Sequence, residues 1–131
     1  MSGVVVTGGA SGIGLASAKA LIADGRAVSL FDLSPSVVAV AELLGAHGVV
    51  VDVSDTDSMA SAVEQAAAAM DGIDGLVHAA GRVLPEPVGM FTIESWDAVV
   101  DVNLRAQALL SQLLLPHFEK ALAAGAAPAI V

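Results

Sequence analysis

The sequence contains no cysteine and no tyrosine, and it has few positive charges. Its 131 residues include 5 Lys and Arg against 14 Asp and Glu, which gives a formal net charge of −9. The lack of cysteine excludes disulfides, thiolate metal sites and thiol nucleophiles. Because the few cations are scattered through an acidic chain, we expect neither nucleic acid nor a membrane surface as a partner.

Long hydrophobic runs and targeting signals are missing as well. No apolar stretch approaches the ~18 residues that a membrane span needs, and no charged segment or cleavage site of a secretory signal opens the chain. The sequence therefore predicts a cytoplasmic protein. His47 and His117 have no partners at metal-ligand spacing, so we expect no metal site. With 56% hydrophobic residues, the chain can bury the core of one domain.

Short apolar runs of strand length alternate with longer helical segments. The expected strands are residues 4–7, 27–31 and 49–51, a strand that begins at Leu76, and a last strand that starts at 129–131. Right-handed helical crossovers build each half of such a sheet outward from the first strand. We therefore expect an α/β doubly wound parallel sheet of the Rossmann type, with strand order 3-2-1-4-5.

Capping residues mark the expected starts of two helices. The second helix takes Ser34 as its N-cap and Pro35 as its first residue, and it closes at Gly45. A capping box of Ser54 and Asp57 opens the third helix.

The segment 82–92 carries two prolines and a glycine without helical periodicity, which predicts a loop. Helix resumes near Glu94 and runs to residues 124–125, with a break around Asn103. The second half of this helix has more apolar side chains than one sheet face needs, so we expect part of it to pack on another subunit. These side chains are Leu104, Leu109, Leu110, Leu113, Leu114 and Phe118.

The most informative segment is Thr-Gly-Gly-Ala-Ser-Gly-Ile-Gly at residues 7–14, between the first strand and its helix. Gly8, Gly12 and Gly14 allow a tight turn and let a pyrophosphate approach backbone N–H groups at the helix N-terminus. No Gly-Lys-Ser or Gly-Lys-Thr occurs, which excludes a Walker-type loop. An ordinary glycine-rich turn is the alternative, and the position between strand and helix favours a dinucleotide site.

Asp32 ends the second expected strand, close to the ~20-residue offset after the glycines at which an acid binds an adenosine ribose. Its charge repels a 2′-phosphate, and neither Ser11 nor Leu33 offers a cation to hold one. The sequence therefore predicts NAD(H) rather than NADP(H) as the cofactor. The alternative for Asp32 is a solvated carboxylate or a helix cap.

Three further motifs follow the glycine turn and Asp32: Asp52-Val53, His78-Ala-Ala-Gly81 and Asp101-Val-Asn-Leu104. Together, along the whole chain, the motifs resemble those of the short-chain dehydrogenases/reductases. The resemblance implies that Asp52 meets the adenine amino group and Val53 its ring, and that residues 79–81 line the adenosine and ribose side of the cofactor. For Asp52 the alternative is a cap on the next helix. The expected cofactor-binding residues are Gly8, Ser11, Gly12, Ile13, Gly14, Asp32, Leu33, Asp52, Val53, Ala79, Ala80 and Gly81.

The resemblance also implies an enzyme that moves a hydride between NAD(H) and a secondary alcohol or ketone, as a homo-oligomer, dimer or tetramer. Asn103 matches the asparagine that helps to organise a proton relay in this family, with a helix-capping amide as the alternative. The family's catalytic serine and Tyr-x-x-x-Lys follow the fifth strand. Because the sequence has no tyrosine, we expect residues 1–131 alone to be inactive.

His78 departs from the family pattern, which usually has asparagine at that position. A lone histidine in a strand is more often a hydrogen-bonded residue near the core than a catalyst, and we assign it no catalytic role. Residues 82–92 would lie near the substrate in this family, and their side chains specify little beyond an apolar wall.

The sequence stops inside its last expected strand. Such a strand leaves a sheet edge and an apolar face uncovered, and independent domains normally protect both. We therefore interpret residues 1–131 as one dinucleotide-binding domain that is incomplete at its C-terminal end. Two alternatives stay open: a truncated chain that only binds nucleotide, and a structural partner that supplies an interaction surface.

Overall fold

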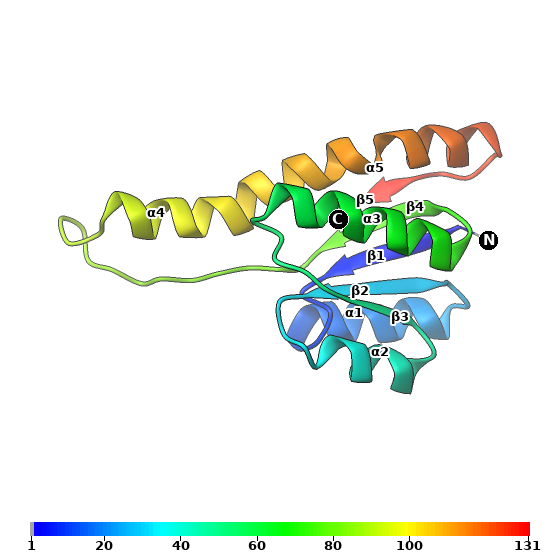
Figure 1. The fold of residues 1–131 in the computed structure, drawn as a ribbon, viewed down its shortest axis with the longest axis horizontal. Coiled ribbons are helices and arrows are strands. Elements are labelled where there is room, and N and C mark those ends of the chain that lie inside the picture. The colour runs from blue at the N-terminus through cyan, green and yellow to red at the C-terminus, as the bar shows by residue number, and fades with distance from the viewer. Residues whose placement is uncertain (1) are drawn as a thin grey trace.

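Parallel strands form the central sheet of the computed structural model, which describes residues 2–131 (Figure 1). The strands are β1 (Gly3–Thr7), β2 (Val28–Asp32), β3 (His47–Val50), β4 (Ile73–His78) and β5 (Ala129–Ile130). Their order in the sheet is β3-β2-β1-β4-β5, and every neighbouring pair is parallel. The predicted fold class and strand order are confirmed.

Helices cover both faces of this sheet. They are α1 (Gly12–Ala23), α2 (Val37–Leu44), α3 (Thr56–Met70), α4 (Ile93–Val100) and α5 (Ala106–Ala123), with a π-helical turn η1 (Asp101–Arg105) between the last two. α1 and α2 pack on one face, and α3 and α5 pack on the other (Figure 1). Within residues 2–131, none of the helices is long and apolar enough to cross a membrane.

The side chains of β1 serve both cores. Val5 packs on the side of α3 and α5, whereas Val4 and Val6 pack on the side of α1 and α2. Successive side chains of a strand point to opposite faces of the sheet. A continuous apolar run is therefore what a central strand needs when helices cover both faces.

The register brings the carboxyl ends of the central strands to one edge of the sheet. Thr7, the last residue of β1, pairs with Phe31 in β2 and with His78 at the end of β4. The loops that follow these strands therefore emerge side by side. In open α/β sheets this edge is where ligands bind.

The predicted start of α2 is wrong. The helix begins at Val37, after a turn in which the Ser34 carbonyl accepts a hydrogen bond from the Val37 N–H at 3.1 Å. The Ser34 hydroxyl lies 2.8 Å from the Ser36 hydroxyl, so Ser34 and Pro35 belong to the turn and not to the helix. The predicted end is confirmed, because Gly45 is the C-cap with a left-handed φ of 66°.

The predicted capping box of α3 is also wrong. Asp55 is the N-cap, and its carboxylate accepts hydrogen bonds from the Asp57 N–H at 3.2 Å and the Ser58 hydroxyl at 2.5 Å. The Ser58 hydroxyl, followed by the backbone N–H groups of Ser58 and Asp57, holds the pKa of Asp55 below its ordinary 3.8. Ser54 and Asp55 are both good capping residues, and the backbone turn before α3 places Asp55 at the capping position.

Both β3 and β4 start earlier than the sequence predicts, at His47 and Ile73. Each contains a glycine, a residue with low strand propensity, which obscured the start of the strand. Gly48 pairs with β2 and Gly75 pairs with β1. Pairing with the neighbouring strand therefore overrides the local preference. β3 also ends one residue earlier than the predicted segment 49–51.

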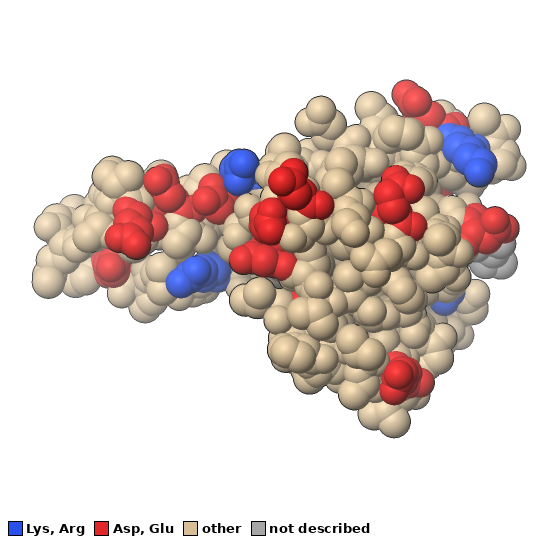
Figure 2. Space-filling view, in the orientation of Figure 1, with Lys and Arg blue, Asp and Glu red and all other residues tan. Residues whose placement is uncertain are grey.

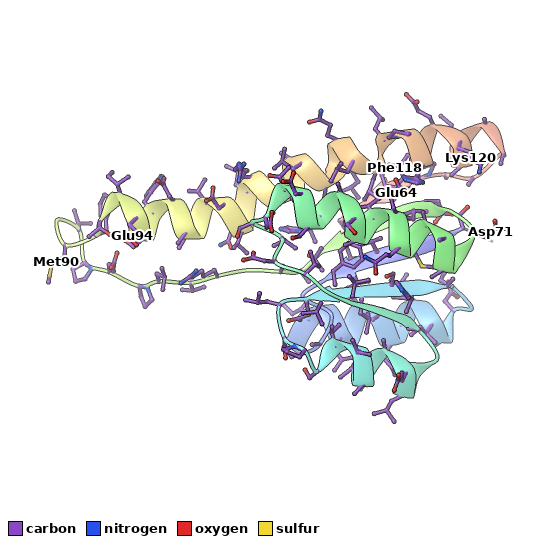
Figure 3. The ribbon with its side chains drawn as sticks, in the orientation of Figure 1. Glu64, Asp71, Met90, Glu94, Phe118 and Lys120 are labelled. Atoms are coloured by element: carbon purple, nitrogen blue, oxygen red, sulfur yellow. The ribbon has the colours of Figure 1, made fainter. Side chains whose placement is uncertain are left out.

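Residues 82–100, which we call the arm, extend away from the sheet (Figure 1). Residues 82–92 contain no helix, as predicted, and Met90 lies at the far tip (Figure 3). Thr92 then caps α4 in a capping box with Ser95. The chain continues through η1 into α5, so the predicted break around Asn103 takes the form of a π-helical turn within one long helix.

Most of the apolar surface of α5 is used inside the domain. The side chains that pack in or against the core of α3 and α5 include Leu109, Leu110, Leu113, Leu114 and Phe118. Of the residues expected to be in surplus, only Leu104 remains largely outside, with 65% of its surface exposed. Leu109, Leu113 and Phe118 are only partly buried, so the packing of part of this helix on another subunit stays a prediction.

Candidate cofactor cleft at the carboxyl edge of the sheet

A cleft of about 1290 Å³ lies over the carboxyl ends of the strands. Its walls come from the loops that follow β1, β2, β3 and β4, and from α4 and η1. Every residue that the sequence predicts to bind the cofactor lines this cleft: Gly8, Ser11, Gly12, Ile13, Gly14, Asp32, Leu33, Asp52, Val53, Ala79, Ala80 and Gly81. The fold thus brings together segments that are far apart in the sequence.

The glycine turn leaves the N-terminus of α1 open to the cleft. Gly12 has a φ of +56°, and a Cβ added there would meet nothing within 4 Å, so the missing side chain opens space. At Gly14 an added Cβ would collide with the Gly8 carbonyl, so this glycine lets the helix approach the strand end. Ser11, the N-cap, makes no side-chain capping hydrogen bond. The first N–H groups of α1 are therefore available to an anion.

The carboxylate of Asp32 joins two of the loops. One oxygen accepts a hydrogen bond from the Ala10 N–H in the glycine turn, and the other accepts one from the Ser34 N–H, each at 2.9 Å. These bonds fix the carboxylate at the cleft wall. Because a carboxylate has about four acceptor positions, each oxygen keeps one for a ligand hydroxyl. Next to it, the side chain of Leu33 is 68% exposed.

Asp52 and Val53 line the next part of the cleft. One Asp52 oxygen accepts hydrogen bonds from the N–H of Ser54 at 2.9 Å and from its hydroxyl at 2.6 Å. The alternative that Asp52 caps α3 is wrong, since Asp55 is the cap. The Asp52 carboxylate remains exposed, whereas Val53 is buried.

Thr7 and His78 form a hydrogen-bonded chain below the cleft. The buried Thr7 hydroxyl accepts a hydrogen bond from the Ala80 N–H at 3.0 Å and lies 2.9 Å from His78 Nδ1. His78 Nε2 lies 3.1 Å from the carbonyl oxygen of Val102 in η1. A carbonyl can only accept, so Nε2 carries the proton, and Nδ1 accepts from the Thr7 hydroxyl.

Asn103 binds the backbone of Arg82 with both ends of its amide. Its Oδ1 accepts from the Arg82 N–H at 2.7 Å, and its Nδ2 donates to the Arg82 carbonyl at 3.0 Å. The side chain of Asn103 is not part of the cleft wall, although Arg82 and Val102 are. The structure therefore places Asn103 behind the wall, as a tie between η1 and the start of the arm.

Residues 2–127 match the sequence profile described as short chain dehydrogenase. The chain belongs to this family. A curated relative, the 2-dehydro-3-deoxy-L-rhamnonate dehydrogenase (NAD(+)) of Sphingomonas sp. (strain SKA58), is 38% identical over 115 residues, which are 86% of this chain and 46% of the relative. This chain spans about half the length of the curated relatives it matches.

Solved structures of similar proteins carry two different cofactors. The 3-ketoacyl-(acyl-carrier-protein) reductase from Brucella melitensis, complexed with NADH, has a TM-score of 0.92 and 30% identity, covering 98% of this chain and 55% of that one. A blue fluorescent protein from a metagenomic library, in complex with NADPH, has a TM-score of 0.82 and 30% identity, covering 88% and 50%. The likeness of fold alone does not distinguish the two cofactors.

Sequence reasoning missed several residues of this short chain dehydrogenase cleft. Glu94, Asp97 and Asp101 line its outer end, and Figure 2 shows acidic side chains gathered on the arm and where it meets the domain. Their spacing places them on one face of a helix, a signal that was present in the sequence. The buried Thr7 carried a weaker signal, a hydroxyl in an otherwise apolar strand.

The loop of the arm contributes little to the cleft. Of residues 82–92 only Arg82 lines it. Farther out, Leu84, Phe91 and Trp96 help to line a separate small hollow of about 230 Å³ within the arm. The apolar side chains of residues 82–92, which the sequence predicts to lie near the substrate, therefore lie along the arm and do not line the cleft.

Proposed function

We propose that this chain is the NAD(H)-binding part of a dehydrogenase that interconverts a secondary alcohol and a ketone. The observation that carries the proposal is the Asp32 carboxylate, held by the N–H groups of Ala10 and Ser34 at the wall of the glycine-lined cleft. Its position beside the N-terminus of α1 matches the geometry of a dinucleotide site.

The pyrophosphate would lie at the glycine turn. Gly12 leaves open space there, and the N–H groups at the start of α1 present partial positive charge to an anion. The Ser11 side chain makes no hydrogen bond to these N–H groups. The residues at the turn therefore fit a bound pyrophosphate.

The adenosine ribose would bind Asp32. Its remaining acceptor positions suit the two ribose hydroxyls, and its charge disfavours a 2′-phosphate. Leu33 supplies no cation to offset that charge. These features support NAD(H) over NADP(H).

The remaining cofactor contacts would come from the later loops. Asp52 would accept from the adenine amino group, and the buried Val53 would pack on the ring. Ala79, Ala80 and Gly81 would form the opposite wall. The bound nicotinamide cofactor supplies the hydride chemistry, while these residues hold and orient it.

Asn103 would take part in proton transfer only through the backbone that it positions. It holds Arg82 at the end of the wall and lies in the π-helical turn beside Val102. The sequence has no tyrosine, so the group that exchanges the substrate proton would lie outside residues 1–131. A homo-oligomeric, cytoplasmic enzyme acting on a small molecule is the setting we propose.

Turnover by the full-length protein tests this function. With NAD⁺ and a panel of secondary alcohols, or NADH and the matching ketones, we expect a change in NADH absorbance with at least one substrate. An absence of NAD-linked turnover over a broad panel would contradict the proposal.

A nucleotide-binding protein without catalysis is the second candidate. One observation favours it: residues 1–131 supply the lining of the candidate cofactor cleft, but they include no tyrosine that could act as a general acid. Tight NADH binding by the full-length protein, without turnover on any substrate, would select this candidate.

A further inference from the structure

We propose that His78 is a positioning residue, which holds the cleft wall Ala79–Gly81 against η1 through its Nε2–H. The inference rests on the proposed function, since it concerns the wall that would face the cofactor. His78 does not line the cleft itself and so acts through its neighbours.

The wall is tied to η1 at both of its ends. On one side His78 Nε2 lies 3.1 Å from the Val102 carbonyl oxygen. On the other side the Asn103 amide makes two hydrogen bonds to the backbone of Arg82. The tied residues flank Ala79–Gly81 directly, and their partners are adjacent in η1. The wall is therefore a short segment suspended between two neighbouring anchors.

A third contact fixes the wall from below. The Ala80 N–H donates to the Thr7 hydroxyl, which in turn donates to His78 Nδ1. Thr7 immediately precedes the glycine turn, and an added Cβ at Gly8 would come within 2.9 Å of the Ala79 carbonyl. The position of His78 is thus coupled to both the wall and the turn that faces the pyrophosphate site.

The two ring nitrogens have separate roles, which two substitutions distinguish. His78→Asn places an amide near Nδ1, where its oxygen can accept from Thr7, but it is too short to reach Val102. His78→Gln extends an N–H donor toward Val102 and gives up the acceptor for Thr7. If the link to η1 positions the wall, Gln should preserve function and Asn should not.

Hydrogen exchange of the full-length protein without cofactor is the first test. In His78→Asn we expect the Arg82 amide, which is bonded to Asn103, to exchange about fivefold faster, the loss expected for one hydrogen bond. In His78→Gln it should exchange within about twofold of wild type. His117→Gln, far from the cleft and beside Glu64, is the matched control and should exchange like wild type. NMR of the ring nitrogens in wild type should show the Nε2–H tautomer.

Titration with NADH at a temperature well below the melting of each protein is the second test. We expect His78→Asn to weaken NADH binding about fivefold and His78→Gln to stay within about twofold of wild type. A merely structural histidine would lower the melting temperature of both variants without separating their affinities.

The outcomes separate this inference from the proposed function. Equal exchange of the Arg82 amide in the Asn and Gln variants, or an Nδ1–H tautomer, would overturn the role of His78 even if NADH binds. If wild type fails to bind NADH while the exchange pattern is as expected, the positioning role stands and the proposed function fails.

Discussion

Single residues at the carboxyl edge shape the cleft and carry the proposed choice of cofactor. Asp32 is the clearest example, because its carboxylate is fixed by hydrogen bonds from two loops and cannot turn away from the site without breaking them. Gly12 is a second example, since its backbone lies in the left-handed region and its missing side chain opens the cleft.

Replacing Asp32 and its neighbour should change cofactor preference. In Asp32→Ala with Leu33→Arg, the repelling carboxylate is removed and a guanidinium is added that can bind a 2′-phosphate. We expect the ratio of NADPH to NADH affinity to rise about tenfold or more, measured by fluorescence titration of the full-length protein. Asp24→Ala, which removes an exposed carboxylate at the other end of α1, should leave the ratio unchanged. An unchanged ratio in the double variant would place Asp32 away from the ribose.

Substitution of Gly12 should weaken cofactor binding for a reason other than strain. Gly12→Val and Gly25→Val both put a side chain on a glycine with left-handed φ and open surroundings, so each should cost about 1–2 kcal/mol of stability. Only Gly12 lines the cleft, so only its variant should lose NADH affinity. Thermal melts and NADH titrations of both variants check this. Equal NADH affinity in a folded Gly12→Val protein would move the pyrophosphate away from the turn.

Helices and strands were predictable from the sequence where the deciding contacts are local. The glycine that ends α2 follows from the local residue pattern. The order of the strands was predictable for another reason, because strands alternate with helices and their crossovers are right-handed. The capping residue of α3 was not predictable, because Ser54 and Asp55 both suit that position and the backbone turn decides between them. The pairing of His78 with Val102 and Thr7 was not predictable either, because it joins residues that only the folded sheet brings together.

The cap of α3 makes part of the stability depend on pH. The pKa of Asp55 is lower in the folded chain than its ordinary 3.8, chiefly through the Ser58 hydroxyl. The cap therefore contributes its full stability above that value and loses it as the pH falls through the lowered pKa. In Asp55→Asn, which can still cap, this acid-dependent part should be absent.

Chemical unfolding at a series of acidic pH values measures this effect. Ser58→Ala should return the pKa of Asp55 toward its ordinary value, because it removes the largest cause of the shift. Identical pH profiles for wild type and Asp55→Asn would show that ionisation of Asp55 contributes no acid-dependent stability.

At the scale of the whole molecule, large apolar side chains are exposed along the arm and along α5. Val83, Val88 and Ile93 are 81%, 97% and 71% exposed, and along the outer side of α5 Leu115 and Leu122 are 53% and 64% exposed. Large exposed apolar patches are typical of surfaces that pack against another protein chain or cause aggregation. We therefore expect the isolated 131-residue polypeptide to self-associate or aggregate and to show no dehydrogenase activity.

Sedimentation of the purified 131-residue polypeptide checks this expectation. Fast-sedimenting species are expected across the concentration range, whereas the full-length protein should form a discrete homo-oligomer. A stable monomer with a cooperative melt would contradict it and would favour an independent nucleotide-binding domain.

The central claim is that the loops at the carboxyl edge of the sheet bind NAD(H). Hydrogen–deuterium exchange of the full-length protein with and without saturating NADH tests it most directly. We predict that NADH slows exchange in residues 8–14, 32–33, 52–53 and 79–81, and leaves the amino-terminal edge of the sheet unchanged. Protection confined to other segments, or no protection at saturating NADH, would contradict the account.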